Sequence, residues 1–171
     1  TINTNTLIVE KKLPNIKGQI NYLVALNSTK LIANILFDGI YLIDLSSSTR
    51  QLLYSMPNGK KINGICVIDE GWIAVITEDS ELILINPVFQ KIDLGITGLQ
   101  CVQQNGDGLM IGTAHGLYKY ENGNLITLIN GTELLNIVSL YSDENKNLWI
   151  GTYGQGLFKL NDKYKLERID V

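Results

Sequence analysis

Three features of the sequence predict an all-β protein that is built from repeated four-stranded units. Short apolar runs recur along the 171 residues, with polar, turn-rich stretches such as SDENKN and QQNGDG between them. Two of these runs lie in near copies of each other, at residues 108–123 and 147–161. No segment keeps a helical hydrophobic period, since the nearest one, GTELLNIVSL, ends in a β-branched tail. Four short strands in about 40 residues are typical of a β-propeller blade.

The two near copies define the repeat. NLWIGTYGQGLFKLN at 147–161 and GLMIGTAHGLYKYENG at 108–123 both contain an apolar strand that ends in Ile-Gly-Thr. A Gly-Leu pair, an aromatic residue and a lysine follow in both copies. Residues 71–86 and 30–45 are weaker copies, which keep the two apolar runs and the polar turn but lack the Gly-Thr pair. The repeats start at Ile20, Ile62, Leu99 and Ile137.

The last repeat gives the expected strand order of every blade. Its strands are expected at residues 137–142, 147–152, 156–160 and 166–170. The second strand packs between neighbouring blades and should therefore be almost wholly apolar. Gly112 and Gly151 lie at the far end of this strand, where backbones crowd or bulge. Gly116 and Gly156 end the following turn, where a positive φ favours glycine.

The repeat register divides the chain into four blades and one extra N-terminal strand. TLIVEKKLPNIKG at 6–18 aligns with QLLYSMPNGKKING at 51–64, which contains the fourth strand of the first repeat. The expected units are 1–19, the last strand of a preceding blade and a linker, and the blades 20–61, 62–98, 99–136 and 137–171. We expect an arc of a larger propeller, with a closed four-blade ring as the alternative. An arc exposes two blade faces, so other blades or a second copy of the chain are expected partners.

Composition and motifs exclude several classes of function. The net charge of −3 does not indicate binding to nucleic acid, which is itself negatively charged. No apolar run approaches the ~20 residues of a membrane span, so no membrane contact by this segment is expected. The chain begins at Thr1 and reads as an excised or processed segment. Cys66 and Cys101 are not part of a CxxC motif, and we expect both to be buried thiols. Neither a metal nor a cofactor is expected.

Residues 137–161 resemble the two-component regulator propeller repeat. The resemblance rests on the Asp/Asn-rich turn, the Leu-Trp-Ile-Gly-Thr strand and the Gly-Leu pair with its aromatic residue. Residues 99–123 are similar, with Met110 where the family prefers Trp. The resemblance implies the periplasmic sensor region of a bacterial hybrid two-component regulator, ahead of a membrane helix and a kinase. It implies oligosaccharides as common ligands and no enzymatic activity in the segment itself.

Polar and aromatic side chains are expected to gather on one face of the propeller. The turns between the second and third strands and the links between blades share that face, where loops on a rigid scaffold carry function. Acids and amides bind sugar hydroxyls, and an aromatic ring can stack on a sugar. The alternative is that these are ordinary polar turns. The candidate ligand-binding residues are Phe37, Asp38, Asp79, His115, Tyr153 and Gln155.

Two other classes of function remain open. One is a scaffold that binds another protein through its face or edge. The other is a propeller lyase, in which His115, the single histidine, would act as a general base. The acidic residues lack the spacing of a calcium loop. Trp72 and Trp149 are assigned to second strands, where they are expected to pack between blades.

Overall fold

The computed structural model of the chain describes residues 2–3, 8–9, 18–56, 59–68, 71–86, 88–129 and 135–170. These residues form four antiparallel sheets of four strands and one sheet of two strands. Each four-stranded sheet keeps its strands in sequence order, so consecutive strands are hydrogen-bonded neighbours. The prediction of an all-β protein of four-stranded antiparallel blades is therefore confirmed. We number these sheets blade 1 to blade 4 in chain order.

The strands agree closely with the repeat seen in the sequence. Blade 1 contains β3 (Ile20–Ala25), β4 (Lys30–Ile35), β5 (Gly39–Asp44) and β6 (Thr49–Ser55). Blade 2 contains β7 (Ile62–Val67), β8 (Ile73–Thr77), β9 (Glu81–Asn86) and β10 (Val88–Asp93). Blade 3 contains β11 (Leu99–Asn105), β12 (Gly108–Thr113), β13 (Gly116–Glu121) and β14 (Asn124–Ile129). Blade 4 contains β15 (Ile137–Ser142), β16 (Leu148–Thr152), β17 (Gly156–Leu160) and β18 (Leu166–Ile169).

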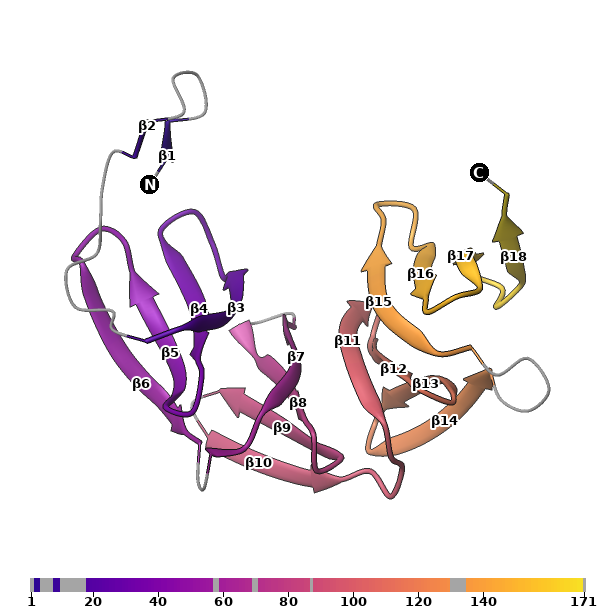
Figure 1. The fold of residues 1–171 in the computed structure, drawn as a ribbon, viewed down its shortest axis with the longest axis horizontal. Helices are drawn as coiled ribbons and strands as arrows, with labels where there is room; N and C mark the ends of the chain where they lie inside the picture. The colour runs from indigo at the N-terminus through magenta and orange to yellow at the C-terminus, as the bar shows by residue number, and fades with distance from the viewer. Residues whose placement is uncertain are drawn as a thin grey trace.

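The four blades follow one another around an open arc (Figure 1). The first strand of each blade lies on the inner side of the arc, and the fourth strand lies on the outer side. Inner strands of neighbouring blades contact one another, β3 with β7, β7 with β11 and β11 with β15. Blades 1 and 4 lie at the two ends of the arc.

The N-terminal residues form a separate small sheet. β1 (Ile2–Asn3) pairs antiparallel with β2 (Ile8–Val9). The extra strand predicted within residues 6–18 lies largely outside the described residues. Its described part, Ile8–Val9, pairs with Ile2–Asn3 and with none of the four blades.

The core consists of three hydrophobic clusters, one between each pair of neighbouring blades. Ile32 and Val75 belong to the cluster between blades 1 and 2. Ile76 and Ile111 belong to the next cluster, and Met110 and Ile150 to the last. Because β8 and β12 contribute to the clusters on both sides, every residue of these two strands is buried. Complete burial of one such aliphatic side chain stabilises the fold by about 1.5–3 kcal/mol.

Every blade carries a bulge near the start of its first strand. The pairing register between the first and second strands shifts after the first residue of each blade. Gly112 lies opposite Cys101 just past this shift, and Gly151 lies opposite Ser139. A Cβ on Gly112 would lie 2.5 Å from Cys101 Sγ and from Ile137 Cγ2, the latter in blade 4. The predicted crowding at these glycines is confirmed.

Glycines also end the turns between second and third strands, as the sequence predicts. Gly116 and Gly156 have φ values of 139° and 88°, in the region that favours glycine. The threonine before each turn closes it through its hydroxyl. Thr113 Oγ1 donates to the carbonyl of Gly116 at 3.1 Å, and Thr152 Oγ1 donates to that of Gly156 at 2.7 Å.

Of the two tryptophans assigned to second strands, Trp149 lies in one and Trp72 does not. Trp72 precedes β8 and is not part of it. Trp149 belongs to β16, but its neighbours Leu148 and Ile150 face the cluster shared with blade 3. Since successive side chains of a strand alternate between faces, Trp149 lies on the opposite face of blade 4. There Lys159 Nζ lies 5.4 Å from the indole centroid, and Trp149 Nε1 donates to Asp143 at 3.0 Å.

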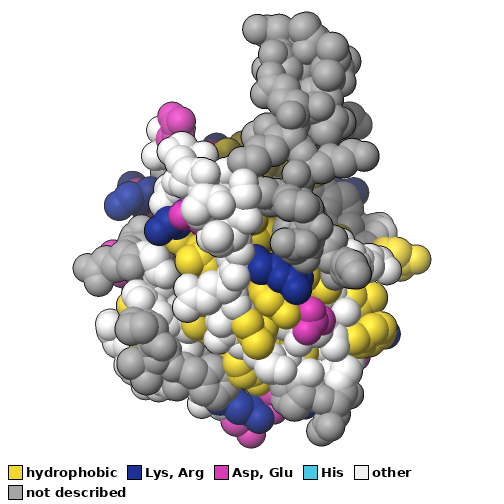
Figure 2. Space-filling view, turned by 90° about the vertical axis from the view of Figure 1, so that its left-hand side faces the viewer, with side chains coloured by type: hydrophobic (Ala, Val, Ile, Leu, Met, Phe, Trp, Pro, Cys, Tyr) yellow, Lys and Arg dark blue, Asp and Glu magenta, His cyan; other side chains and the backbone are white. Residues whose placement is uncertain are grey.

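Large hydrophobic side chains remain exposed at both ends of the arc. Leu23 and Leu52 are 56% and 48% exposed on blade 1. Val138 and Tyr141 are 47% and 63% exposed on blade 4. Figure 2 views the side that lies at the left in Figure 1, where hydrophobic side chains gather at the surface among basic and acidic ones. We call these two surfaces the end faces. On blade 1, Ala33 and Tyr41 lie on the same face as Leu23 and Leu52 and are buried, so only part of that face is exposed.

Candidate ligand-binding face

One backbone hydrogen bond, repeated in all four blades, places the predicted site residues on a common face. The residue after the second strand donates its N–H to the carbonyl of the residue before the first strand. This bond ties each turn between second and third strands to the link that enters the same blade. The pairs are Leu36 with Gln19 at 2.9 Å, Glu78 with Lys61 at 3.1 Å, Ala114 with Gly98 at 2.9 Å and Tyr153 with Asn136 at 2.7 Å. We call the surface formed by these turns and links the loop face.

The turn of blade 1 presents Phe37 and Asp38. Phe37 is 58% exposed and has a φ of 61°, which is uncommon for a residue other than glycine. A Cβ on Gly59 would lie 3.5 Å from its ring, so the ring lies beside the link between blades 1 and 2. Asp38 accepts a 2.9 Å hydrogen bond from the Tyr41 hydroxyl. Burial, with a smaller contribution from this hydrogen bond, raises the pKa of Tyr41.

The turns of blades 3 and 4 present His115, Tyr153 and Gln155, whose side chains are all exposed. Tyr153 is 76% exposed. The backbone N–H of His115 donates to Thr113 Oγ1 at 3.0 Å, so this turn is fixed through its main chain. The hydrogen bonds and ion pairs of the six candidates stay within single blades. The loop face therefore presents the six from separate turns, and no hydrogen bond or ion pair among the described residues joins side chains of different turns.

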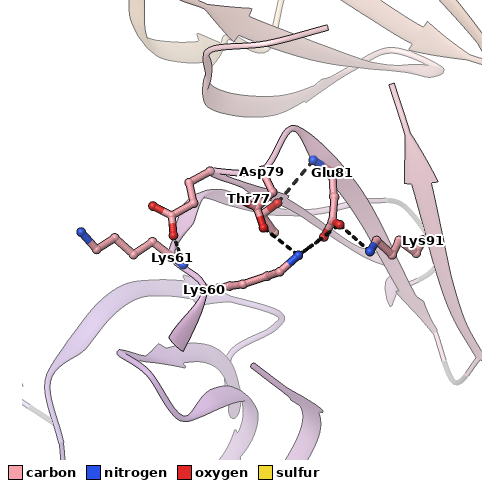
Figure 3. Close-up of polar contacts among 7 residues, drawn as sticks. Lys60, Lys61, Thr77, Asp79, Glu81 and Lys91 are labelled. Carbon is pink, nitrogen blue, oxygen red and sulfur yellow. Dashed lines mark hydrogen bonds and ion pairs between the residues drawn. The ribbon is translucent and has the colours of Figure 1, made fainter. Parts of the chain in front are cut away.

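The turn of blade 2 carries a network of four charges (Figure 3). Lys60 Nζ lies 2.7 Å from Asp79 Oδ2 and 3.1 Å from Glu81 Oε1. Lys91 pairs with the same Glu81 carboxylate. The hydrogen bond to Asp79, with that to Glu81, raises the pKa of Lys60. Burial of Glu81 opposes its ionisation, but Lys91 and Lys60 outweigh it and lower the pKa of Glu81.

This network changes the expected role of Asp79. The carboxylate is half exposed, but it is already paired with Lys60. A ligand hydroxyl can bind its remaining lone pairs without displacing the lysine. The sequence analysis missed Glu81 and Lys91. The available signal was a charged residue at the start of β9 and another in the neighbouring strand β10.

Side-chain amides join the inner strands below the loop face. The Tyr22 hydroxyl donates to the carbonyl of Asn63 at 2.6 Å, and Asn63 Nδ2 donates to that of Leu99 at 2.8 Å. Gln100 Nε2 donates to Asn136 Oδ1 at 2.8 Å. Asn63 and Gln100 are the extra residues of their bulges. These bonds connect each blade to the next and hold the turns of the loop face in fixed relative positions.

Potential metal ligands and thiols lie scattered over the described part of the chain. Among the described residues, no three His, Cys, Asp or Glu side chains form a group that could hold a metal ion. Cys66 and Cys101 are free thiols, and burial raises the pKa of each to about 12. Both thiols therefore stay protonated at neutral pH. Within the same described ranges, no helix is long and apolar enough to cross a membrane.

Repeated four-stranded blades around an arc, with a loop face built from their turns, define a β-propeller type of repeat protein. Residues 134–154 match the family described as two-component regulator propeller. This match confirms the resemblance found in the sequence for the last repeat. No curated protein matches the chain in sequence.

Three solved structures illustrate the similarity of fold. The extracellular domain of BT4673 from B. thetaiotaomicron has a TM-score of 0.74 and 21% identity, over 95% of this chain and 23% of that one. One structure of this domain is described as part of a putative one-component system, and a second structure is described as part of a putative hybrid two-component system. A virginiamycin B lyase from Staphylococcus aureus has a TM-score of 0.80 and 16% identity, over 99% of this chain and 61% of that one. A streptogramin B lyase has a TM-score of 0.82 and 15% identity, over 99% and 60%.

These similarities show the fold alone, because the identities are low. The chain spans about a quarter of the BT4673 domain, at 23%, and less than two thirds of either lyase, at 61% and 60%.

Proposed function

We propose that the chain is part of the extracytoplasmic, periplasmic sensor region of a hybrid two-component regulator. The observation that carries the proposal is the match of residues 134–154 to the two-component regulator propeller family. The likeness to the extracellular domain of BT4673 supports the same location. The segment acts by binding, and any kinase activity belongs to another part of the regulator.

The proposed ligand is an oligosaccharide bound at the loop face. Phe37 and Tyr153 offer exposed rings for stacking on a sugar. Asp38, Asp79 and Gln155 offer oxygen and amide groups for its hydroxyls, and His115 adds a further hydrogen-bonding group. Binding would bias the arrangement of sensor chains only as far as one arrangement binds the ligand more tightly.

A thermal-shift screen against plant, host and microbial oligosaccharides tests this proposal. One glycan class should give a saturable rise in melting temperature, because a ligand that binds only the folded state stabilises it. Tyr153→Ser and Phe37→Ser should weaken that rise, and Tyr141→Ser, an exposed aromatic of an end face, should leave it unchanged. Equal loss in all three variants, or no glycan-dependent rise in the wild type, would contradict binding at the loop face.

We also propose that the end faces bind other blades or a second copy of the chain. Blade 3 packs on blade 4 through one of its faces. The residues on the exposed face of blade 4 occupy the same register positions as the residues on that face of blade 3. Tyr141 and Trp149 correspond to Gln103 and Met110. The end face of blade 4 therefore has the geometry of one half of an inter-blade interface.

The scaffold and lyase alternatives predict different results. A scaffold predicts no glycan binding and retention of a protein partner. A lyase predicts turnover that is lost in His115→Ala. The similarity to two lyases is one of fold, and His115 is held in its turn by a backbone contact alone.

A further inference from the structure

A cavity of about 290 Å³ opens between blades 3 and 4, away from the loop face. Its walls come from the turn after β11, from strands β12 and β13, from Lys146 in the turn after β15, and from the turn between β17 and β18. These turns lie at the strand ends opposite those that build the loop face. The residues that matter for the argument are Asp107, Met110, Lys119, Glu121, Leu160 and Tyr164.

Lys119 breaks the apolar pattern of the inter-blade interfaces. It is the fourth residue of β13 and pairs in register with Met110 of β12. The same repeat position is Leu42 in blade 1 and Leu84 in blade 2. Both leucines pack against the hydrophobic clusters between their blades. The third interface thus has a lysine where the first two have leucine, and the cavity lies beside this lysine.

The lysine is held in place by groups from both blades. Its side chain is only 13% exposed, and Nζ lies 2.7 Å from Glu121 Oε1 of the same strand. Nζ also donates to the Tyr164 hydroxyl of blade 4 at 3.2 Å. The hydrogen bond to Glu121 raises the pKa of Lys119, so the amine is charged at neutral pH. A charge in such an interface gives little net stability, and an apolar residue of similar size is often equal or better.

We propose that this cavity is a second binding site, for an uncharged polyol of monosaccharide size. Lys119 supplies a charged donor, and Glu121 and Asp107 supply acceptors. A hydroxyl can donate and accept, so a polyol satisfies both kinds of group without adding charge. Met110 and Leu160 contribute apolar wall, and the half-exposed Tyr164 ring can cover one face of a sugar ring. The volume lies at the lower end of small-molecule pockets, near ~300 Å³.

The chain offers a matched pair of lysines for the test. Lys159 occupies the position of Lys119 in blade 4, but it lies over Trp149 on the end face and lines no part of the cavity. Backbone NMR spectra of the full chain would be recorded with millimolar D-glucose, D-xylose and N-acetyl-D-glucosamine. At least one sugar should give saturable shifts at the amides of Lys119, Glu121 and Tyr164. Lys119→Leu should weaken binding about tenfold or more, as for loss of a charged hydrogen bond, and Lys159→Leu should not change it.

Stability separates a binding role for Lys119 from a structural one. Lys119→Leu should keep or raise the urea midpoint, because leucine is the residue of the first two interfaces. A lower midpoint would identify the lysine as a structural ion-pair partner and overturn the proposal. The absence of saturable shifts with all three sugars would also overturn the proposal.

Asp107→Asn, in an exposed turn, is a second variant that should also weaken binding, and unchanged affinity would count against the site. Tyr153→Ser should leave these shifts intact, so failure of the loop-face proposal is distinguishable from failure of this one.

Discussion

At the scale of single residues, the glycine of the Ile-Gly-Thr motif is explained by the lack of room for a side chain at its position. Gly112 and Gly151 each face the residue that follows the bulge of the first strand. In blade 2 the sizes are reversed, with Gly64 on the first strand opposite Ile76 on the second. In blade 1 the equivalent pair is Tyr22 and Asn34, so a glycine at this pair is a feature of blades 2 to 4. The family motif places the glycine on the second strand.

Replacement of Gly112 by alanine should destabilise the fold by about 1–3 kcal/mol, the usual penalty for overpacking a core. The new Cβ would meet Cys101 Sγ and Ile137 of the next blade, both at 2.5 Å. Gly151→Ala is the matched control, because its Cβ would crowd mainly Ser139 Oγ, which can rotate. Urea unfolding of both variants measures the difference. Equal losses of stability would show that the contact across the blade interface does not matter.

At the scale of the elements, a single carboxylate organises the turn that precedes β16. Asp143 accepts hydrogen bonds from the backbone N–H groups of Asn145 and Asn147 and from the Asn147 side chain. It also accepts from Trp149 Nε1. These bonds, above all those from the Asn147 side chain, lower the pKa of Asp143. The Asp/Asn-rich turn and the tryptophan of the motif are therefore one hydrogen-bonded unit.

Asp143→Ala should lower the urea midpoint at neutral pH, because four N–H donors lose their acceptor. The pKa in the folded state lies below the ordinary value of 3.8. The stabilisation is therefore complete above this ordinary value and is lost as the pH falls through the lower, folded value. The difference between wild type and variant should shrink over that acidic window in a pH series of urea titrations. Asp107→Ala, in the matching turn of blade 3, serves as control, and a difference that persists in acid would contradict the role of the charge.

The elements were the part of the structure that the sequence predicted best. Apolar runs of strand length, separated by turns and repeated four times, identify blades even where the Gly-Thr pair is missing, as at residues 30–45 and 71–86. The cavity and the charge network were not predictable in this way. The sequence shows Lys119 only as a lysine within a strand. It does not show that the side chain lies on the face of blade 3 that packs on blade 4. Lys60, Glu81 and Lys91 come from three segments whose proximity depends on how blade 2 folds.

At the scale of the whole molecule, the arc has two unlike ends. Blade 1 exposes Leu23 and Leu52, and blade 4 exposes Val138 and Tyr141. Within the arc, the equivalent faces form the hydrophobic clusters between blades. Contact between an end of one copy and the opposite end of another is therefore heterologous, and it either closes a ring or extends a chain.

Sedimentation velocity should show association that increases with protein concentration in the micromolar range. Leu23→Glu and Tyr141→Glu should each reduce it, because a charge on an apolar contact surface is costly to bury. A mixture of the two variants should recover a dimer, since one intact pair of opposite ends remains. Tyr153→Glu, on the loop face, should leave association unchanged. A wild-type protein that stays monomeric at all concentrations would exclude this mode of assembly.

The hydrogen bond that joins each turn to its link uses backbone atoms alone, and it occurs four times. Mutation of the side chains at positions 37, 38, 79, 115, 153 and 155 therefore leaves this bond in place. Selection can change the chemistry of this surface while the framework beneath it stays the same. The same property makes the arc a suitable starting point for protein engineering, in which libraries of these positions would be screened for new specificities on an unchanged fold.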